Sequence, residues 1–263
     1  MCGIIAAASE RNVGKLLVQG LHKMEYRGYD SAGIALHQND KIAHLRTLGK
    51  VKLLEEKMIS EKPKSKLGIA HTRWATHGEP SEENAHPHKS NDRVYIVHNG
   101  IIENYLDLKD FLKQEGYSFT SQTDSELIAH MLEYFLSKGN TMLDAMYLTK
   151  EKLDGAYAIA AIDKEDDTNI IIARSKSPLL IGVGIDEFLA ASDPLAIGQL
   201  TNEFIFLEDG DGAEISSQSY TIYDESKNKV DREITNIDIS SQATSKGEYK
   251  HFMEKEIYEQ PEA

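Results

Sequence analysis

Cysteine and long apolar runs are both scarce in this sequence. Of the 263 residues only Cys2 is a cysteine, so no disulfide can form within the chain, which is typical of a reducing compartment. No segment approaches the ~20 apolar residues of a transmembrane helix, and the apolar start at residues 4–8 is too short for a signal-peptide core. These absences predict a cytoplasmic protein.

Positive charge is also in short supply. The chain has 29 Lys and Arg against 43 Asp and Glu, which gives a net charge of −14. Such a surface repels phosphate backbones and anionic lipids, so we expect neither nucleic acid nor a membrane as the main partner. Gly182-Val183-Gly184 lacks the third glycine of a dinucleotide-binding fingerprint, and the sequence contains no P-loop. We therefore expect no organic cofactor.

The elements that the sequence does contain predict an α+β fold with antiparallel sheets. Several short β-rich runs occur with a few helices between them, without regular βαβ alternation. Helices are predicted at residues 12–24, 51–58, 105–115, 125–138, 141–152 and 248–260. Strands are predicted at residues 4–8, 32–37, 42–46, 67–70, 94–97, 157–163, 169–174, 179–183, 188–191, 204–207 and 212–215.

Residues 71–92 are rich in His, Pro, Asn and Ser and are expected to form a long functional loop. Arg73 beside Trp74 either covers the indole at the surface or holds a carboxylate through two parallel hydrogen bonds. A metal site is the alternative, because four histidines occur close together. They are His71, His77, His86 and His88. Neither a helical H-x₃-H pair nor a second cysteine supports that alternative, so we expect no metal.

Cys2 is either a small buried apolar residue or a nucleophile. Its small side chain permits removal of Met1, which would make it the N-terminal residue. The thiol would then share its residue with an α-amine of pKa about 7.7–8.0, a suitable proton acceptor near neutral pH. One residue would thus supply both the nucleophile and its base.

Two further motifs each have a structural and a functional interpretation. Asn99-Gly100 is typical of a tight turn, but a side-chain amide beside a glycine N–H also suits an oxyanion hole. Asp124 is placed to cap the helix that follows it, and a carboxylate there could equally receive an ammonium group.

Together these motifs resemble the class II, or N-terminal-nucleophile, glutamine amidotransferases. The similar segments are Met1-Cys2-Gly3-Ile4, residues 25–33, residues 71–80, Asn84-Ala85-His86-Pro87-His88, residues 97–104, Thr123-Asp124, Gly155-Ala156-Tyr157, Ala191-Ser192-Asp193 and Tyr258-Glu259-Gln260-Pro261. The resemblance is strongest to the branch that forms glucosamine 6-phosphate. It implies a four-layer αββα sandwich of two mostly antiparallel sheets between helical layers.

The resemblance also implies roles for individual residues. Cys2 would be the nucleophile, and Asn99 with the Gly100 N–H would stabilise the tetrahedral oxyanion. The substrate-binding residues would be Arg73 for the glutamine α-carboxylate, Asp124 for the α-ammonium, Thr76 and His77 nearby, Trp74 as a gate to an ammonia channel, and Arg27 and His86 around the site.

The same resemblance divides the chain and names its partners. Residues 1–245 would be the amidotransferase domain, and residues 246–263 a C-terminal helix and the start of a linker to a missing sugar-isomerase half. The partners would be L-glutamine, that half with fructose 6-phosphate, and a second copy in a homodimer of the full-length protein. The glutaminase domain of another class II amidotransferase, or a non-catalytic glutamine-binding module, remains an alternative.

Overall fold

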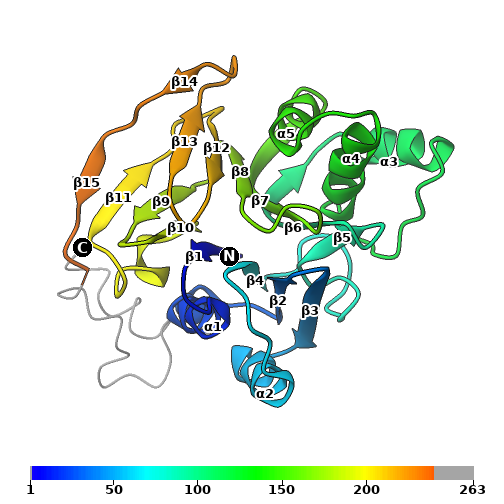
Figure 1. Cartoon of the computed structure of the whole chain (residues 1–263). Coiled ribbons are helices and arrows are strands. Elements are labelled where there is room, and N and C mark those ends of the chain that lie inside the picture. The colour runs from blue at the N-terminus through cyan, green and yellow to red at the C-terminus, as the bar shows by residue number, and fades with distance from the viewer. Residues whose placement is uncertain (1, 240–263) are drawn as a thin grey trace, which may run out of the picture.

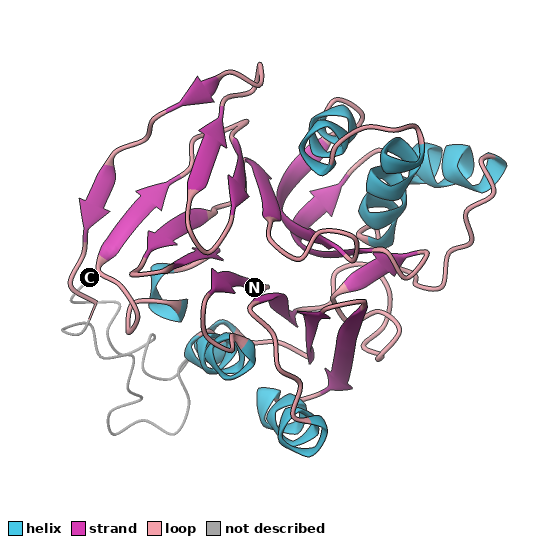
Figure 2. Ribbon diagram, viewed as in Figure 1, coloured by secondary structure: helices cyan, strands magenta, loops and turns pink. Residues whose placement is uncertain are grey.

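Two antiparallel sheets packed face to face form the middle of the molecule, and helices cover both outer faces (Figures 1 and 2). The computed structural model describes residues 2–239. The predicted α+β class and the four-layer arrangement are both confirmed. The predicted helix at 248–260 and the boundary at residue 245 lie outside the described residues.

The first sheet has eight strands in the order β15-β11-β9-β10-β1-β4-β2-β3, and every neighbouring pair is antiparallel. The strand that begins next to Cys2 is therefore an inner strand, with β10 and β4 as neighbours. The bounds are β1 Gly3–Ser9, β2 Ser31–Gln38, β3 Lys41–Leu48, β4 Leu67–Arg73, β9 Leu180–Val183, β10 Glu187–Ala191, β11 Glu203–Phe206 and β15 Ile234–Asn236.

The second sheet has seven strands in the order β14-β13-β12-β8-β7-β6-β5, again with antiparallel neighbours. Its bounds are β5 His88–Ser90, β6 Val94–Ile102, β7 Gly155–Asp163, β8 Ile170–Ser175, β12 Gly212–Ile215, β13 Tyr220–Tyr223 and β14 Lys229–Val230. Helices α1 (Gly14–Lys23) and α2 (Val51–Glu61) cover the first sheet. The second sheet is covered by α3 (Tyr105–Gln114), α4 (Glu126–Ser137) and α5 (Met142–Lys150).

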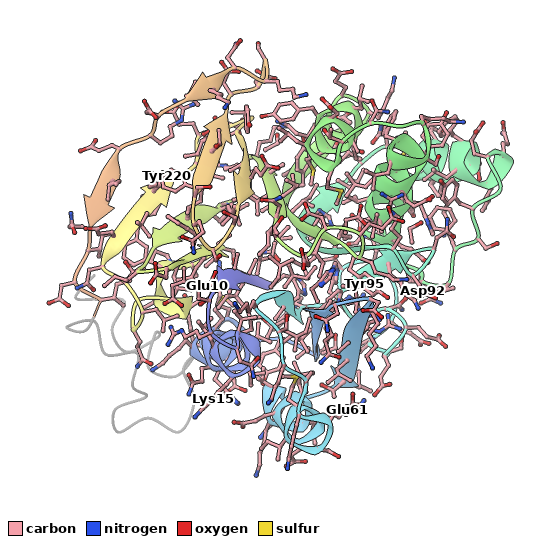
Figure 3. The ribbon with its side chains drawn as sticks, viewed as in Figure 1. Glu10, Lys15, Glu61, Asp92, Tyr95 and Tyr220 are labelled. Atoms are coloured by element: carbon pink, nitrogen blue, oxygen red, sulfur yellow. The ribbon has the colours of Figure 1, made fainter. Side chains whose placement is uncertain are left out.

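Alternation along the strands explains the three buried layers. In β1, Ile5 and Ala7 pack under the helices α1 and α2, whereas Ile4 and Ala6 face the opposite sheet. Because both faces of such a strand are buried, its sequence is apolar throughout rather than alternating with polar residues. Polar side chains on the outer helices face solvent instead, as Lys15 on α1 and Glu61 at the end of α2 do (Figure 3).

Three predictions about local structure were wrong or incomplete. The predicted turn at Asn99-Gly100 does not exist, because β6 continues through both residues to Ile102. Residues 71–92 are not one loop, since β4 extends to Arg73 and β5 occupies His88–Ser90. The strands β13, β14 and β15 were not predicted. None of the helices within residues 2–239 is long and apolar enough to cross a membrane.

Candidate active site

Cys2 lies directly before β1 and is only partly buried. Its Sγ accepts a hydrogen bond of 3.2 Å from the backbone N–H of Trp74, which follows the neighbouring strand β4. Burial nevertheless raises the pKa of the Cys2 thiol, and the Trp74 hydrogen bond only partly offsets this. The sulfur is therefore protonated near neutral pH, and it needs a nearby base before it can act as a nucleophile.

A polar group outside the predicted site residues braces the start of β1. Ser192 Oγ accepts from the Ile4 N–H at 3.0 Å and also lies 3.4 Å from Arg27 Nη1. Arg27 is held in turn by Asp193, at 3.8 Å between Nη1 and Oδ2. These contacts connect Arg27 to the strand that carries Cys2. Ser192 belongs to the Ala191-Ser192-Asp193 motif, but the sequence predicts no role for it.

The amide of Asn99 reaches across from the opposite sheet. Its Nδ2 donates to the backbone oxygen of Cys2 at 3.3 Å. The next residue, Gly100, has φ +128°, and a Cβ built there would lie 1.9 Å from the carbonyl oxygen of Ala156 on β7. Glycine is thus required because the neighbouring strand passes too close for a side chain. The pair Asn99-Gly100 is a feature of a continuous strand beside Cys2.

A cluster of buried histidines lies behind Asn99. The rings of His71 and His86 stack with centroids 4.1 Å apart, and His88 packs edge-on against His86 at 4.5 Å. His86 Nδ1 accepts from the His98 N–H at 3.3 Å, and His88 Nε2 is 3.1 Å from Thr123 Oγ1. Burial lowers the pKa of the four clustered histidines, which are His71, His86, His88 and His98, and it lowers that of His71 to about 3. The cluster is neutral at physiological pH.

These contacts bear on the metal alternative. One ring nitrogen of each clustered histidine already contacts a protein group. Besides the two contacts above, His71 Nε2 lies 3.0 Å from the His98 backbone oxygen and His98 Nδ1 lies 2.8 Å from Ser125 Oγ. Within residues 2–239 no three His, Cys, Asp or Glu side chains are arranged to hold a metal ion. His77, the remaining histidine of that alternative, lies in the loop and packs edge-on against Tyr105 at 5.3 Å.

Arg73 ends β4, and its side chain is almost fully buried. Nη2 donates to the backbone oxygens of His77 at 2.6 Å and Gly78 at 3.0 Å, so the guanidinium holds the loop that follows it. Asp30 lies 3.7 Å from Nη1 and also accepts from the Ala75 N–H at 2.5 Å. The side chain predicted to bind a carboxylate therefore also fixes the loop beside Cys2.

The loop itself is exposed. The Trp74 side chain is 51% exposed and packs on Gly28, where a Cβ would lie 2.4 Å from its ring. Thr76 is exposed as well, one residue before the half-buried His77. The structure therefore groups Cys2, Arg73, Trp74 and Asn99 closely, with Thr76 and His77 further along the same loop.

Asp124 does not cap the helix that follows it. The N-cap of α4 is Ser125, whose side chain makes no capping hydrogen bond. The buried Asp124 carboxylate instead accepts from the backbone N–H of Ile102 at 2.8 Å. Since Ile102 is two residues after Gly100 on β6, this hydrogen bond fixes Asp124 beside the strand that carries Asn99 and Gly100. The capping interpretation was wrong, and the position is compatible with the functional one.

Comparison with known proteins shows which family the chain belongs to. A family model described as a glutamine amidotransferase domain matches residues 71–199. A glutamine–fructose-6-phosphate aminotransferase (isomerizing) from Vibrio parahaemolyticus is 49% identical over 264 residues, which cover 100% of this chain and 43% of that protein. The same enzyme from Haemophilus influenzae is 51% identical over 265 residues, with the same coverage. The chain belongs to the class II glutamine amidotransferases.

Solved structures of class II amidotransferases share the fold. A glutamine phosphoribosylpyrophosphate amidotransferase from B. subtilis superposes with a TM-score of 0.74 at 26% identity, over 87% of this chain and 50% of that one. A class II domain protein from Silicibacter pomeroyi superposes with a TM-score of 0.58 at 12% identity, over 85% of this chain and 99% of that one, which supports the fold alone. The chain spans less than half the length of the curated relatives named above.

Two surface hollows of similar volume, about 570 Å³ beside Lys64 and about 560 Å³ beside Lys89, both lie away from the predicted site. A cavity of about 560 Å³ between β5 and α4 is lined by Lys89, Glu126 and His130 among others, and it contains none of the predicted site residues. Glu126 is already satisfied there, since it accepts hydrogen bonds from Thr120 and from the Ser121 N–H at 2.6 Å. The candidate site is therefore argued from the side chains around Cys2 rather than from cavity size.

Proposed function

We propose that this domain hydrolyses L-glutamine to glutamate and ammonia, with Cys2 as the nucleophile after removal of Met1. The proposal rests on the side-chain amide of Asn99. This residue lies on the opposite sheet, and its Nδ2 donates to the backbone oxygen of Cys2 at 3.3 Å. An amide donor, a glycine N–H and a thiol at one place match the needs of an acyl transfer with a tetrahedral intermediate.

The reaction divides into two balanced halves. The α-amine of Cys2 takes the thiol proton, Sγ forms a bond to the amide carbon of glutamine, and the oxygen becomes an oxyanion between Asn99 Nδ2 and the Gly100 N–H. The carbon–nitrogen bond breaks, and the amine returns its proton to the leaving group, which departs as ammonia. Water then attacks the thioester with the same amine as base, so that glutamate leaves and the thiol is restored.

Glutamine would be held by its charged end. Arg73 has five N–H donors and would bind the α-carboxylate, while Asp124 and the Gly100 carbonyl would receive the α-ammonium. Thr76, His77 and His86 would complete the surroundings, with Arg27 bracing β1. Opposite charges at two points orient the distant amide towards Cys2, and such orientation supplies a large part of the rate. Trp74, exposed over Gly28, would gate the passage of ammonia.

We further propose that in the full-length protein the ammonia passes to fructose 6-phosphate to form glucosamine 6-phosphate. Relatives about half identical over the whole of this chain carry the name glutamine–fructose-6-phosphate aminotransferase. The acceptor sugar would bind the sugar-isomerase half, and the full-length protein would be a cytoplasmic homodimer. The expected product of this domain alone is ammonia.

Two alternatives make different predictions. The first alternative, a glutaminase domain of another class II amidotransferase, is compatible with the likeness to the phosphoribosylpyrophosphate enzyme. That enzyme is only 26% identical to this chain, however, whereas the Vibrio parahaemolyticus fructose-6-phosphate aminotransferase is 49% identical. The sequence that follows residue 263 would separate the two. A non-catalytic glutamine-binding module predicts binding that survives Cys2→Ala and no ammonia release by the unmutated protein.

The test is ammonia release from glutamine by three proteins: one with Cys2 at its N-terminus, one that retains Met1, and Cys2→Ser. We expect turnover by the first and a loss of at least about 10³-fold in the other two, since one lacks the free α-amine and the other the thiol. Equal activity in all three would overturn the proposal.

A further inference from the structure

We infer that His71 is a positioning residue that determines which end of the Asn99 amide faces Cys2. The inference rests on the proposed function, because it concerns the oxyanion donor of that reaction. His71 lies on β4 of the first sheet and Asn99 on β6 of the second, so the contact bridges the two sheets immediately behind the nucleophile.

The contacts of His71 Nε2 fix its proton. This atom lies 3.0 Å from the backbone oxygen of His98 and 2.9 Å from Asn99 Oδ1. A backbone oxygen can only accept, so Nε2 must carry a hydrogen. A nitrogen that carries a hydrogen can only donate to its second neighbour. The Asn99 atom at that position must therefore be the oxygen, and the amide nitrogen must point the other way, towards Cys2.

The other ring nitrogen of His71, Nδ1, also indicates that the hydrogen is on Nε2. His71 Nδ1 is buried and has no hydrogen-bond partner within residues 2–239, so a proton there would have no acceptor. The imidazole is consequently neutral, with its one hydrogen on Nε2. Burial supports this state, because it lowers the pKa of His71 to about 3. Neutral His71 is a permanent donor over the whole working range of pH.

Its surroundings keep the ring in place. His71 is fully buried and pairs with Ile4 of β1 and Gly33 of β2 in the sheet. Its ring stacks on His86 at 4.1 Å, and His86 is itself fixed by the His98 N–H. Water is excluded from around the ring. If the Asn99 amide were flipped, so that Oδ1 and Nδ2 exchanged places, its NH₂ would lie against the N–H of His71. Two donors would then meet with no acceptor between them.

The alternative is that His71 serves only the core, as buried histidines commonly do. A core role predicts lost stability together with an activity loss that is independent of Asn99. A positioning role predicts that the effect of His71 on the rate passes entirely through the Asn99 side chain. A double-mutant cycle separates the two.

The experiment compares glutamine hydrolysis by the protein with N-terminal Cys2, His71→Leu, Asn99→Ala and the double variant, each checked for folding by thermal unfolding. Asn99→Ala should lower kcat by about 10²–10³-fold, as the loss of one oxyanion donor does. We expect His71→Leu to lower kcat by about 10–10²-fold with KM changed less than about threefold, because the glutamine-binding groups are intact. In the double variant His71→Leu should add nothing to the Asn99→Ala loss.

Two conservative variants keep the inference testable if His71→Leu does not fold. In His71→Gln an amide N–H can reach the place of Nε2, whereas in His71→Asn it reaches only the place of Nδ1. We expect His71→Gln to retain kcat within about tenfold and His71→Asn to lose as much as His71→Leu. Losses that multiply in the double variant, or equal losses in the Gln and Asn variants, would overturn the inference.

The outcomes also separate this inference from the proposed function. If Cys2→Ser kept full activity, the proposed function would fail whatever the His71 variants do. If Asn99→Ala lowered kcat as expected but His71→Leu multiplied that loss, only the positioning role would fail. An affinity measurement adds a second readout. Glutamate γ-semialdehyde, whose aldehyde forms a tetrahedral adduct with a thiol, should bind His71→Leu more weakly by the same factor as kcat, while glutamate should bind unchanged.

Discussion

The two sides of the candidate site differ in how they are built. The front is the loop after β4, where Trp74 and Thr76 are exposed and the chain is held by the Arg73 guanidinium. The back is the histidine cluster (His71, His86, His88 and His98), where every residue is at most 4% exposed. One side combines exposed loop residues with the buried charge of Arg73, and the other side is neutral and buried throughout.

This difference suggests a division of labour. A charged guanidinium that holds an exposed loop suits a zwitterionic substrate that must enter and leave. An oxyanion donor, by contrast, is effective only when it is already oriented, which requires rigid and dry surroundings. Changes at the front should therefore affect mainly substrate binding, and changes at the back mainly the chemical step and the stability of the fold.

The largest difference between the front and the back of the site is expected from Arg73→Lys at the front. Lysine keeps the charge but cannot make two parallel hydrogen bonds, and it cannot hold the backbone oxygens of His77 and Gly78 together. We expect kcat/KM for glutamine to fall by about 10–10²-fold, with most of the loss in KM. Steady-state kinetics beside Asn99→Ala, whose loss should lie in kcat, provides the matched control. If Arg73→Lys lowered kcat alone, the claim that the front serves mainly substrate binding would be contradicted.

At the back a smaller effect per residue is expected, in the pH dependence of stability. In the folded protein the pKa values of the clustered histidines lie below the ordinary value, so the unfolded chain binds more protons between the two values. Stability must then fall as the pH drops through about 6.5. Each histidine that stays neutral should lower the free energy of unfolding by about 1.4 kcal/mol between about pH 7.5 and 5.5.

Urea unfolding at several pH values in that window measures the effect, and carboxylates contribute little there because they titrate at lower pH. His71→Gln is the control, because it removes one of the four buried histidines and should reduce the acid-induced loss by about 1.4 kcal/mol. A free energy of unfolding that is constant across the window would contradict the neutral cluster.

The proximity of the candidate site residues was easier to predict from the sequence than their local conformation. Cys2, Arg73 and Asn99 were chosen for their chemistry, and the structure brings all three together. Asn-Gly was misread as a turn because that dipeptide is the usual hairpin signal. What decides the conformation is the long-range pairing of Gly100 with Tyr157 on β7, where the close approach of the backbone demands glycine. Local preference cannot reveal such a contact.

The supporting residues were harder to predict. His71 was noted only as a possible metal ligand, since nothing in its neighbourhood in the sequence indicates Asn99, 28 residues away. Asp124 resembled an N-cap because Asp before a helix usually is one, yet its carboxylate serves the backbone of another strand. Both roles depend on contacts between the two sheets or between a sheet and a distant loop. The histidine spacing in the motif was a signal, but it did not distinguish a buried network from a metal site.

The most direct test of the account is labelling with a glutamine analogue that carries an electrophilic carbon in place of the amide. We expect one equivalent of the analogue to modify Cys2 in the protein with Cys2 at its N-terminus, and we expect activity to be lost in parallel. Glutamine should protect against both the modification and the loss of activity. Peptide mass spectrometry would locate the label. Inactivation that leaves the Cys2 thiol free, or a label on any other residue, would contradict the claim that this thiol attacks the substrate.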